Sequence, residues 1–588
     1  MKEPVKKILE EKKEGENVLE IVDSLSKYKI KDKSGTWIGT RMGRPEKAKL
    51  RKLTGSPNVL FPIGEQGGRF RSVQAAVDIG YIKGDYPIYK CECGNETIYK
   101  ICENCGKETK KMYYCWECRK ASETKCKEHE RVLSYSNRKI DSKHFFDKAI
   151  EHLGLERFEV PELIKGVRGT SSEDHDFENL AKGILRARHN LCVNKDGSVR
   201  YDCTELPVSH FKPKEVGVSV KKLREIGYEK DIYGEDLENE EQILTLMPHD
   251  VILPACPETK DEKADEVFVN IANFVDDELE MFYKLPRFYN LKKKEDLVGQ
   301  LVACMAPHNC AGVIGRVVGF SKCQGLFASP YMHAAMRRDC DGDEAAVMLL
   351  MDVLLNFSRK FLPDHRGGRQ DAPLVLNAHI RAGEVDDQIL DFETCWEYPL
   401  EVYQGAEEGK HSSEVEIETV KTRLKEGRDP FVDVGFTHDS SNFNKGIVNS
   451  SYKYLPTMKE KVGSQMELVS KLRSVDTGDV ARLIIDRHFI RDIRGNLRKF
   501  SQQQFRCVTC NEKFRRPPMI GKCTKCGGKV IFTISEGSIK KYLEPALELA
   551  ENFEIPEYTK QCLDLAKVYI ESIFGKEKDK QVELKQWF

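Results

Sequence analysis

The chain has 588 residues and a formal net charge of −1, with 32% of its residues charged. This length predicts several domains, about three to five by typical domain size. The balanced charge excludes a globally basic protein, so any contact with phosphates must come from local basic patches. The apolar run AAVMLLM is far shorter than the roughly 20 residues of a membrane span, and the N-terminus has no apolar signal segment. We therefore expect a soluble, cytoplasmic protein.

The first 90 residues contain a charged leader, residues 1–30, and then a region rich in Val, Ile, Trp and Phe with glycines between them. The pattern in residues 31–90 predicts short strands and turns. One dense basic segment, RMGRPEKAKLRK, contributes Arg41, Arg44, Lys47, Lys49, Arg51 and Lys52 against a single glutamate. A solvated charged face is the simple interpretation, whereas such density in a neutral chain favours contact with phosphates.

Cysteines in tight pairs predict metal binding, because disulfides are rare in a large intracellular chain, as we expect this one to be. Three sets have the spacing of tetrahedral zinc ligands: Cys91, Cys93, Cys102 and Cys105; Cys115, Cys118, Cys126 and His129; Cys507, Cys510, Cys523 and Cys526. In residues 91–130 an interleaved set made of Cys102, Cys105, Cys115 and Cys118 is the alternative to this local pairing. Each set is fully ligated by protein, so we expect three structural zinc ions.

The most informative segment is MRRDCDGDEAAV, residues 336–347, which places Asp339, Asp341 and Asp343 within five residues. Carboxylates this close repel one another unless a multivalent cation binds them, and hard oxygen ligands suit Mg²⁺. Gly342 permits the tight backbone turn that convergence requires. A solvated acidic loop and a structural Ca²⁺ turn are the alternatives. An EF-hand is excluded because Leu350 stands at the twelfth position, where that motif needs glutamate.

The remaining regions carry weaker signals. Residues 131–295 mix helical patterns with acidic loops and have no motif, so we expect a helical accessory region. Residues 401–500 predict a helical, basic connector, residues 501–535 a zinc ribbon, and residues 536–575 two helices with Leu543, Leu547 and Ala550, then Cys562, Leu565, Tyr569 and Ile573, at helical spacing. Further candidates for contact with a phosphate backbone are Arg337, Arg338, Arg366 and Arg369.

The segment HAAMRRDCDGDEAAVMLL resembles the catalytic stretch of the large subunit of archaeal D-family DNA polymerase. The resemblance runs along nearly the whole chain, from GTWIGTRMGRPEKAK to the last residues, and the DxDGD core is similar to the aspartate loop of multisubunit RNA polymerases. It implies an α+β multidomain fold with two double-psi β-barrels, the first in residues 31–90 and the second in residues 296–400, together with zinc modules and helical accessory regions.

The family also implies an activity and partners. Two Mg²⁺ ions would serve nucleotidyl transfer from dNTPs to a primer, with Asp341 and Asp343 as ligands and Asp339 as an auxiliary ligand. Lys49 and Lys52 match lysines that face the aspartates in the family. A small exonuclease-type subunit and a separate N-terminal half would complete the enzyme, because family members carry further N-terminal domains. The alternatives are a non-catalytic zinc-ribbon scaffold that binds DNA and a clamp, and an RNA polymerase subunit.

The last residues, 576–588, form a charged linker and the tail QVELKQWF. This tail matches the pattern by which replication proteins dock onto a sliding clamp, with Gln581, Leu584, Trp587 and Phe588 as the contact residues. Terminal aromatic residues without a core to join are costly unless a partner covers them. We therefore expect the tail to bind a sliding clamp.

Overall fold

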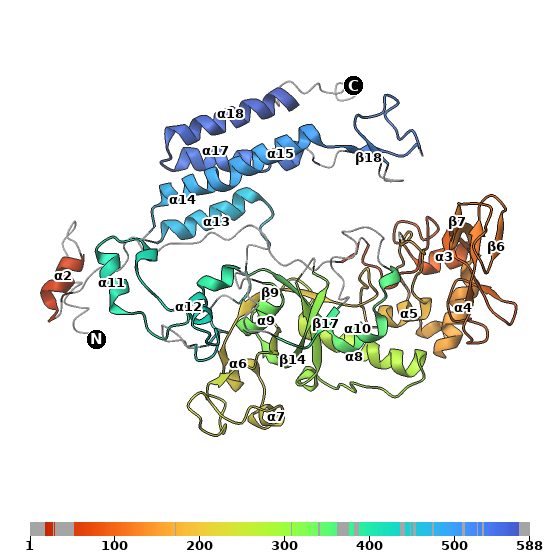
Figure 1. Cartoon of the computed structure of the whole chain (residues 1–588), viewed down its shortest axis with the longest axis horizontal. Helices are drawn as coiled ribbons and strands as arrows, with labels where there is room; N and C mark the ends of the chain where they lie inside the picture. The colour runs from red at the N-terminus through yellow and green to blue at the C-terminus, as the bar shows by residue number, and fades with distance from the viewer. Residues whose placement is uncertain are drawn as a thin grey trace. The chain divides into compact units, whose positions relative to one another are not determined.

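The computed structural model (Figure 1) describes residues 18–27, 29, 52–53, 55–170, 172–306, 309–338, 342–361, 375–380, 387–434, 442–446, 448–450, 454–472, 475–507, 512–525, 527–531, 534 and 536–575. The chain divides into a larger unit, Lys47–Tyr398 with Ile417–Ser450, and a smaller unit, Met1–Glu46 with Pro399–Glu416 and Ser451–Phe588. Helices and sheets occur in both units, which confirms the expected α+β multidomain class. Among the described helices, none has the length and apolar character that a membrane crossing requires.

Six strands of the larger unit pair in a closed ring. The pairing runs β12–β15–β9–β16–β13–β14 and returns to β12, and β17 adds to β14 at the outside. The strands are β9 (Tyr201–Pro207), β12 (Asp250–Pro254), β13 (Leu301–Met305), β14 (Ala311–Ser321), β15 (Gly325–Ala328), β16 (Glu344–Leu349) and β17 (Val375–Asn377). Closure leaves no open edge within the ring. Buried side chains from all six strands, such as Cys203, Val302 and Val347, belong to the main hydrophobic core, and others of the same strands, such as Ala303 and Val318, belong to two smaller cores.

Two of these strands depart from the expected domain boundaries. β9 and β12 come from residues 131–295, the stretch in which the sequence predicted only an accessory region. The expected boundary at residue 295 therefore runs through the ring. Strand pairing between segments this far apart leaves no local pattern, because each short apolar run is compatible with many partners.

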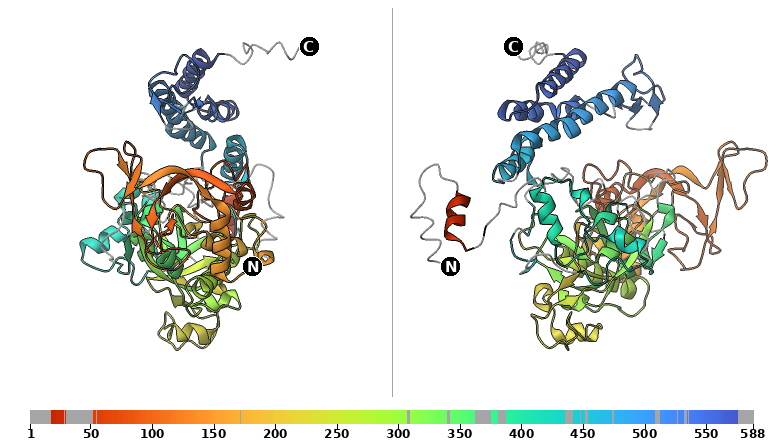
Figure 2. Two further views of the ribbon diagram at one scale, coloured as in Figure 1. Left: turned by 90° about the vertical axis from the view of Figure 1, so that its right-hand side faces the viewer. Right: turned by 60° about the vertical axis from the view of Figure 1, so that its left-hand side comes forward.

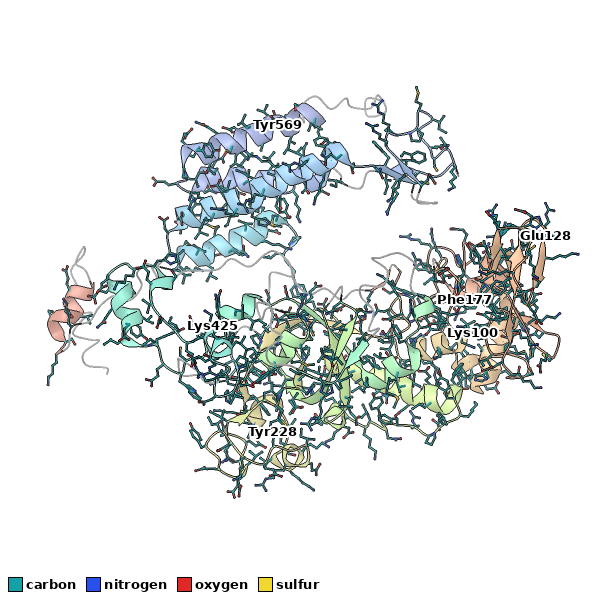
Figure 3. The ribbon with its side chains drawn as sticks, in the orientation of Figure 1. Lys100, Glu128, Phe177, Tyr228, Lys425 and Tyr569 are labelled. Atoms are coloured by element: carbon teal, nitrogen blue, oxygen red, sulfur yellow. The ribbon has the colours of Figure 1, made fainter. Side chains whose placement is uncertain are left out.

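The N-terminal part of the larger unit packs on the same core. Strand β1 (Tyr81–Pro87) pairs antiparallel with β8 (Tyr135–Asp141), beside α3 (Val73–Ile79), α4 (Ser142–Leu153) and α5 (Leu180–Arg188). Phe177, labelled in Figure 3, packs against three aromatic rings from different segments of this part. Its ring lies edge-on to Phe61 with centroids 5.4 Å apart, and it also contacts Tyr86 and Tyr99. In the described part of residues 31–90 the strands are β1 and β2 (Tyr89–Lys90), each in a small sheet of its own, so the first barrel stays a prediction.

Two buried ion pairs involve α5, and one of them, that of Lys182, ties this part to the residue after α8 (Ala264–Asp277) and to Asn356 at the end of α10 (Leu350–Asn356). Arg186 and Glu178 are fully or almost fully buried and their charged groups are 2.6 Å apart. Lys182 pairs with Glu278 at 2.8 Å. Removing one partner of such a buried pair costs about 3–5 kcal/mol, because the other charge is left without compensation.

Smaller elements surround the ring. A second core joins ring residues to α6 (Pro213–Val216), α7 (Val220–Glu225), β10 (His210–Phe211) and β11 (Leu244–Thr245). Gly319 of β14 permits the approach of α6, since a Cβ there would lie 2.7 Å from a side-chain atom of Val216. Helices α9 (Pro330–Ala335) and α12 (Val420–Lys425) share a further small cluster.

The cysteine-rich stretch forms two three-stranded sheets. The first has β2 (Tyr89–Lys90) between β3 (Glu96–Thr97) and β4 (Lys110–Lys111). The second has β5 (Tyr113–Cys115) between β6 (Lys120–Ser122) and β7 (Val132–Leu133). These sheets are too short to bury cores of their own, which is typical of modules stabilised by a metal.

The smaller unit is mainly helical (Figure 2). Its helices are α2 (Val18–Leu25), α11 (Leu400–Glu407), α13 (Met458–Ser470), α14 (Thr477–Leu483), α15 (Ile490–Gln502), α16 (Glu536–Lys540), α17 (Leu543–Asn552) and α18 (Glu557–Phe574). A π-helical turn, Ile484–Phe489, joins α14 to α15. A three-stranded sheet with β18 (Phe505–Cys507) between β19 (Lys513–Phe514) and β20 (Val530–Ile531) follows α15.

Helices α17 and α18 lie where the sequence predicts two helices, with the short α16 before them, but of the apolar face expected for α18 only Cys562 is buried. The structure buries Cys562, Leu563, Ala566 and Ile570 there, whereas Tyr569 is 64% exposed and lies on the outer side of the helix (Figure 3). Leu565 and Ile573 are exposed as well. The helix carries apolar residues on more than one face, so spacing could not decide which face meets the core.

Candidate active site

The aspartate loop joins α9 to the ring strand β16, and of its three aspartates the structure describes Asp343. Asp339 and Asp341 lie outside the described residues. Gly342 has a φ of 95°, in the left-handed region where a side chain is strained, as the sequence predicts for a tight turn. Strand β16 thus begins one residue after a carboxylate that is 43% exposed.

The neighbouring strand β9 holds the end of this loop. The backbone amides of Gly342 and Asp343 donate hydrogen bonds to Glu205 Oε1, at 3.1 and 3.2 Å. The Glu205 amide donates in turn to the Asp343 carbonyl at 2.9 Å. Sequence reasoning missed Glu205, because a glutamate in the run YDCTELP carries no local signal of its contact with a loop so far along the chain.

Two arginines precede the aspartates, and one of them contacts the loop. Arg338 Nη1 lies 2.9 Å from Asp343 Oδ2 and donates a hydrogen bond to it. Arg337 has a positive φ of 62°. The guanidinium of Arg338 lies where it can hold a negatively charged group beside the carboxylate.

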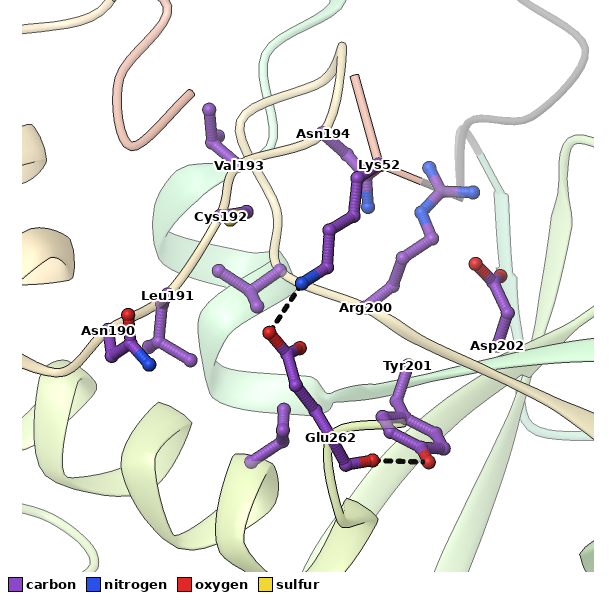
Figure 4. Close-up of a pocket in the computed structure, with 12 residues that line it drawn as sticks. Lys52, Asn190, Leu191, Cys192, Val193, Asn194, Arg200, Tyr201, Asp202 and Glu262 are labelled. Atoms are coloured by element: carbon purple, nitrogen blue, oxygen red, sulfur yellow. Dashed lines mark hydrogen bonds and ion pairs between the residues drawn. The ribbon is translucent and has the colours of Figure 1, made fainter. Parts of the chain in front are cut away.

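Of the six predicted site residues in the basic segment, the structure describes Lys52. Its Nζ lies 2.5 Å from Glu262 Oε1, in a small pocket that also includes Asn194, Tyr201 and Asp202 (Figure 4). The Glu262 carbonyl accepts a hydrogen bond from the Tyr201 hydroxyl at 2.9 Å. Lys52 is therefore tied to one end of β9, the strand whose Glu205 contacts the aspartate loop.

The first cysteine cluster brings together the four expected side chains. The sulfurs of Cys91, Cys93, Cys102 and Cys105 all lie within 4.8 Å of one another. Gly94 and Gly106, with φ of 88° and 72°, turn the chain after each pair, and their amides donate to the carbonyls of Cys91 and Cys102. Four soft ligands at this spacing could hold a zinc ion.

The second cluster has the same form with one histidine. Its ligand atoms, from Cys115, Cys118, Cys126 and His129, also lie within 4.8 Å of one another. His129 Nδ1 faces the sulfurs at 3.3–3.6 Å, and its Nε2 lies 3.0 Å from a carboxylate oxygen of Glu117. A carboxylate behind a histidine ligand is typical of metal sites, because it fixes the ring and its tautomer.

The electrostatics of the second cluster favour a thiolate at Cys126, whereas the contact with the Cys115 sulfur raises the pKa of the Cys118 thiol to about 11. Hydrogen bonds from the Glu128 backbone amide and from His129 lower the pKa of the Cys126 thiol to about 7. The thiolate is the form that binds metal.

In the described part of the chain the cysteines of residues 91–130 group locally, and the interleaved set is not brought together.

The other predicted site residues are described in part or not at all. In the third cluster Cys507 and Cys523 are buried. The remaining predicted residues lie outside the described part: Cys510, Cys526, Arg41, Arg44, Lys47, Lys49, Arg51, Arg366, Arg369, Gln581, Leu584, Trp587 and Phe588.

Comparison with known families decides the relationship. Residues 157–461, just over half of the chain, match the family described as DNA polymerase II large subunit DP2, catalytic domain. Residues 2–124 match the central domain of the same subunit. The chain belongs to the DNA polymerase II large subunit family. The resemblance to the D-family large subunit is thereby confirmed.

Individual members of the DNA polymerase II large subunit family are similar along nearly the whole chain. The subunit of Archaeoglobus fulgidus is 47% identical over 583 residues, which are 97% of this chain and 50% of the relative. The subunit of Nanoarchaeum equitans is 44% identical over 96% of this chain and 49% of its own length. The subunit of Pyrococcus furiosus is 42% identical over 95% of this chain and 44% of its own length. The chain thus spans about half the length of the curated relatives it matches.

Proposed function

We propose that this chain supplies the catalytic centre of a DNA-directed DNA polymerase, which transfers nucleotides from dNTPs to a primer 3′-hydroxyl. The observation that carries the proposal is the match of residues 157–461 to a polymerase catalytic domain, in the segment that contains the carboxylate triplet. We propose that this chain acts in the cytoplasm.

The chemistry follows from the donor set. Asp341 and Asp343 would hold Mg²⁺, and Asp339 would assist them. Two bound Mg²⁺ ions would lower the pKa of the primer hydroxyl and neutralise the incoming phosphates. Asp343 fits this role, because its carboxylate is partly exposed while its backbone is held on β9 by Glu205. Arg338 beside it, and Arg337, would hold DNA or triphosphate oxygens.

The fold supports this proposal through the six-stranded ring. We propose that it is the second double-psi barrel and that the first barrel includes the basic segment, whose arginines and Lys47 would contact the phosphate backbone together with Arg366 and Arg369. The second barrel would then include β9 and β12 from residues 131–295, and residues 501–535 would form a zinc ribbon.

Further subunits complete the proposed enzyme. We propose that the enzyme also contains the N-terminal half of the large subunit, and a small subunit that supplies 3′→5′ exonuclease activity. Structural zinc in the three cysteine clusters would hold the small modules in shape, which the two described clusters support.

Lys49 and Lys52 are expected to act on the transferred phosphate. Replacing either with alanine should lower the turnover rate on the order of 10²-fold and leave primer-template affinity nearly unchanged, because charge that matters only during transfer acts on the transition state. Single-turnover extension and DNA-binding titrations measure the two quantities.

Glu262→Ala is the matched control for Lys52, since it removes the ion-pair partner and leaves the lysine in place. If Glu262→Ala lowers the rate as much as Lys52→Ala, the pair is structural. If both lysine variants only weaken DNA binding and reduce its salt dependence, the segment is a DNA-holding surface.

Deleting Gln581–Phe588 should remove stimulation by a sliding clamp and leave the rate of single-nucleotide addition intact. The tail would raise the effective concentration of enzyme at the primer end. Its deletion should therefore shorten the products made in the presence of the clamp. Leu584, Trp587 and Phe588 would act as buried anchors worth about 2 kcal/mol each. Calorimetry of the isolated C-terminal peptide with the clamp, compared with a peptide carrying Trp587→Ala and Phe588→Ala, measures this. Equal affinities would show that the motif matches by chance.

Primer extension tests the proposed function itself. The chain is combined with the N-terminal half and the small subunit, and extension with dNTPs is compared with extension with NTPs. No extension with either would favour a scaffold, and extension with NTPs alone would favour an RNA polymerase.

A further inference from the structure

The carboxylate of Glu205 is the feature that carries an inference beyond the aspartates. It is fully buried on β9, and one of its oxygens accepts the hydrogen bonds of two successive loop amides, those of Gly342 and Asp343. With the bond from its own amide to the Asp343 carbonyl, Glu205 fixes the backbone of Asp343 on both sides. The direction of the Asp343 side chain depends on this backbone.

The other oxygen of Glu205 meets a second buried group. Glu205 Oε2 lies 3.0 Å from His333 Nδ1, and both side chains are fully buried. His333 belongs to α9, whose first turn is capped by the hydroxyl of Ser329. A buried carboxylate is costly unless neighbouring groups compensate its charge. The two loop amides do so at Oε1, and the His333 ring packs against Oε2.

The same histidine reaches the loop by a second route. The His333 carbonyl accepts a hydrogen bond from the Arg338 amide at 2.9 Å. The Arg338 side chain in turn donates to Asp343 Oδ2 at 2.9 Å. The Glu205 carboxylate therefore supports the backbone of Asp343, and the main chain of His333 supports the arginine that faces the Asp343 carboxylate.

We propose that Glu205 and His333 are positioning residues, which set the direction of the Asp343 carboxylate for binding the catalytic cation. Neither would touch the cation or the substrate. Partners behind metal ligands act in this way, and their loss typically lowers metal affinity or activity about 10- to 100-fold. The proposal rests on the proposed function for its cation.

The variants follow from the geometry. Glu205→Ala removes the acceptor of both loop amides, whereas Glu205→Gln keeps an amide oxygen that can accept them and loses the charge facing His333. His333→Gln removes the ring that faces Glu205 Oε2 and leaves the main-chain bond to Arg338 in place. The matched control is Asp276→Asn, since Asp276 is also buried and its carboxylate accepts three backbone amides, of Phe288, Tyr289 and Asn290, in another loop of the same unit.

Iron-directed cleavage of the chain measures cation binding and does not depend on polymerase activity. The full chain is treated with Fe²⁺, ascorbate and peroxide, and mass spectrometry locates the cuts. Wild type should be cut at residues 339–343, with protection by Mg²⁺. Glu205→Ala should need about 10- to 100-fold more iron for the same cutting, with Glu205→Gln and His333→Gln between it and wild type. Asp276→Asn should match wild type, and thermal unfolding of each variant identifies any loss of fold.

Extension by the reconstituted enzyme supplies the second readout. Glu205→Ala should raise the Mg²⁺ concentration for half-maximal rate by the same factor and leave the KM for dNTP unchanged. The proposal is overturned if folded Glu205→Ala, or Glu205→Gln where the alanine variant fails to fold, follows Asp276→Asn in both readouts. If wild type never extends a primer but its cleavage still depends on Glu205, the proposed function fails and the positioning role stands.

Discussion

Replacing Asp341 or Asp343 with alanine is expected to abolish primer extension, with a loss of at least about 10³-fold in rate. The cation held by these carboxylates would stabilise the transition state by several kcal/mol, and each 1.4 kcal/mol corresponds to about tenfold. DNA binding and folding should survive, because Asp343 is partly exposed and its backbone bonds to Glu205 do not need its side chain. Rapid-quench extension, DNA-binding titration and thermal unfolding measure the three properties.

Asp479→Ala serves as the control for the aspartate variants. Asp479 is exposed on the smaller unit, in an ion pair with Arg482, and exposed pairs contribute little. Its removal should leave extension at the wild-type rate. Near-wild-type extension by the double variant of Asp341 and Asp343 would show that the aspartate loop does not catalyse the reaction.

Metal analysis of the purified chain is expected to return three zinc ions, and chelation should unfold the short modules around them. Zinc binding supplies folding free energy on the order of 10 kcal/mol in small modules, and the sheets around the first two clusters have few residues with which to build a core of their own. Cys102→Ser should lose one ion and destabilise the first module.

The control for the zinc experiment is Cys310→Ser, which changes an exposed cysteine outside the clusters. It should retain every ion and unfold like wild type. Fewer than two zinc ions in metal-replete protein would contradict the assignment. A chelated chain that unfolds as wild type does would contradict the structural role.

Local signals in the sequence predicted local features well. The spacing of Cys91 to Cys105 and of Cys115 to His129 predicted two clusters, and the structure brings the same side chains together. Gly342 was expected to turn the aspartate loop, and its φ is positive. In each case the residues that must meet are close in the chain, so their spacing limits the geometry.

Contacts between residues far apart in the chain could not be predicted from the sequence pattern. The contact of Glu205 with the aspartate loop depends on the register between β9 and β16, and a strand's partner is not encoded in its own residues. The pairing of Lys52 with Glu262 likewise joins segments far apart. On α18, apolar residues on two faces left the buried face undecided until its neighbours α15 and α17 were in place.

The most direct test of the central claim is primer extension by the reconstituted enzyme with dNTPs or NTPs, in Mg²⁺, for wild type and for the Asp341→Ala and Asp343→Ala chain. The account predicts that wild type extends the primer with dNTPs and discriminates against NTPs, and that the double variant binds the same DNA without extending it. Equal extension by the two enzymes, or extension by wild type with NTPs alone, would contradict it.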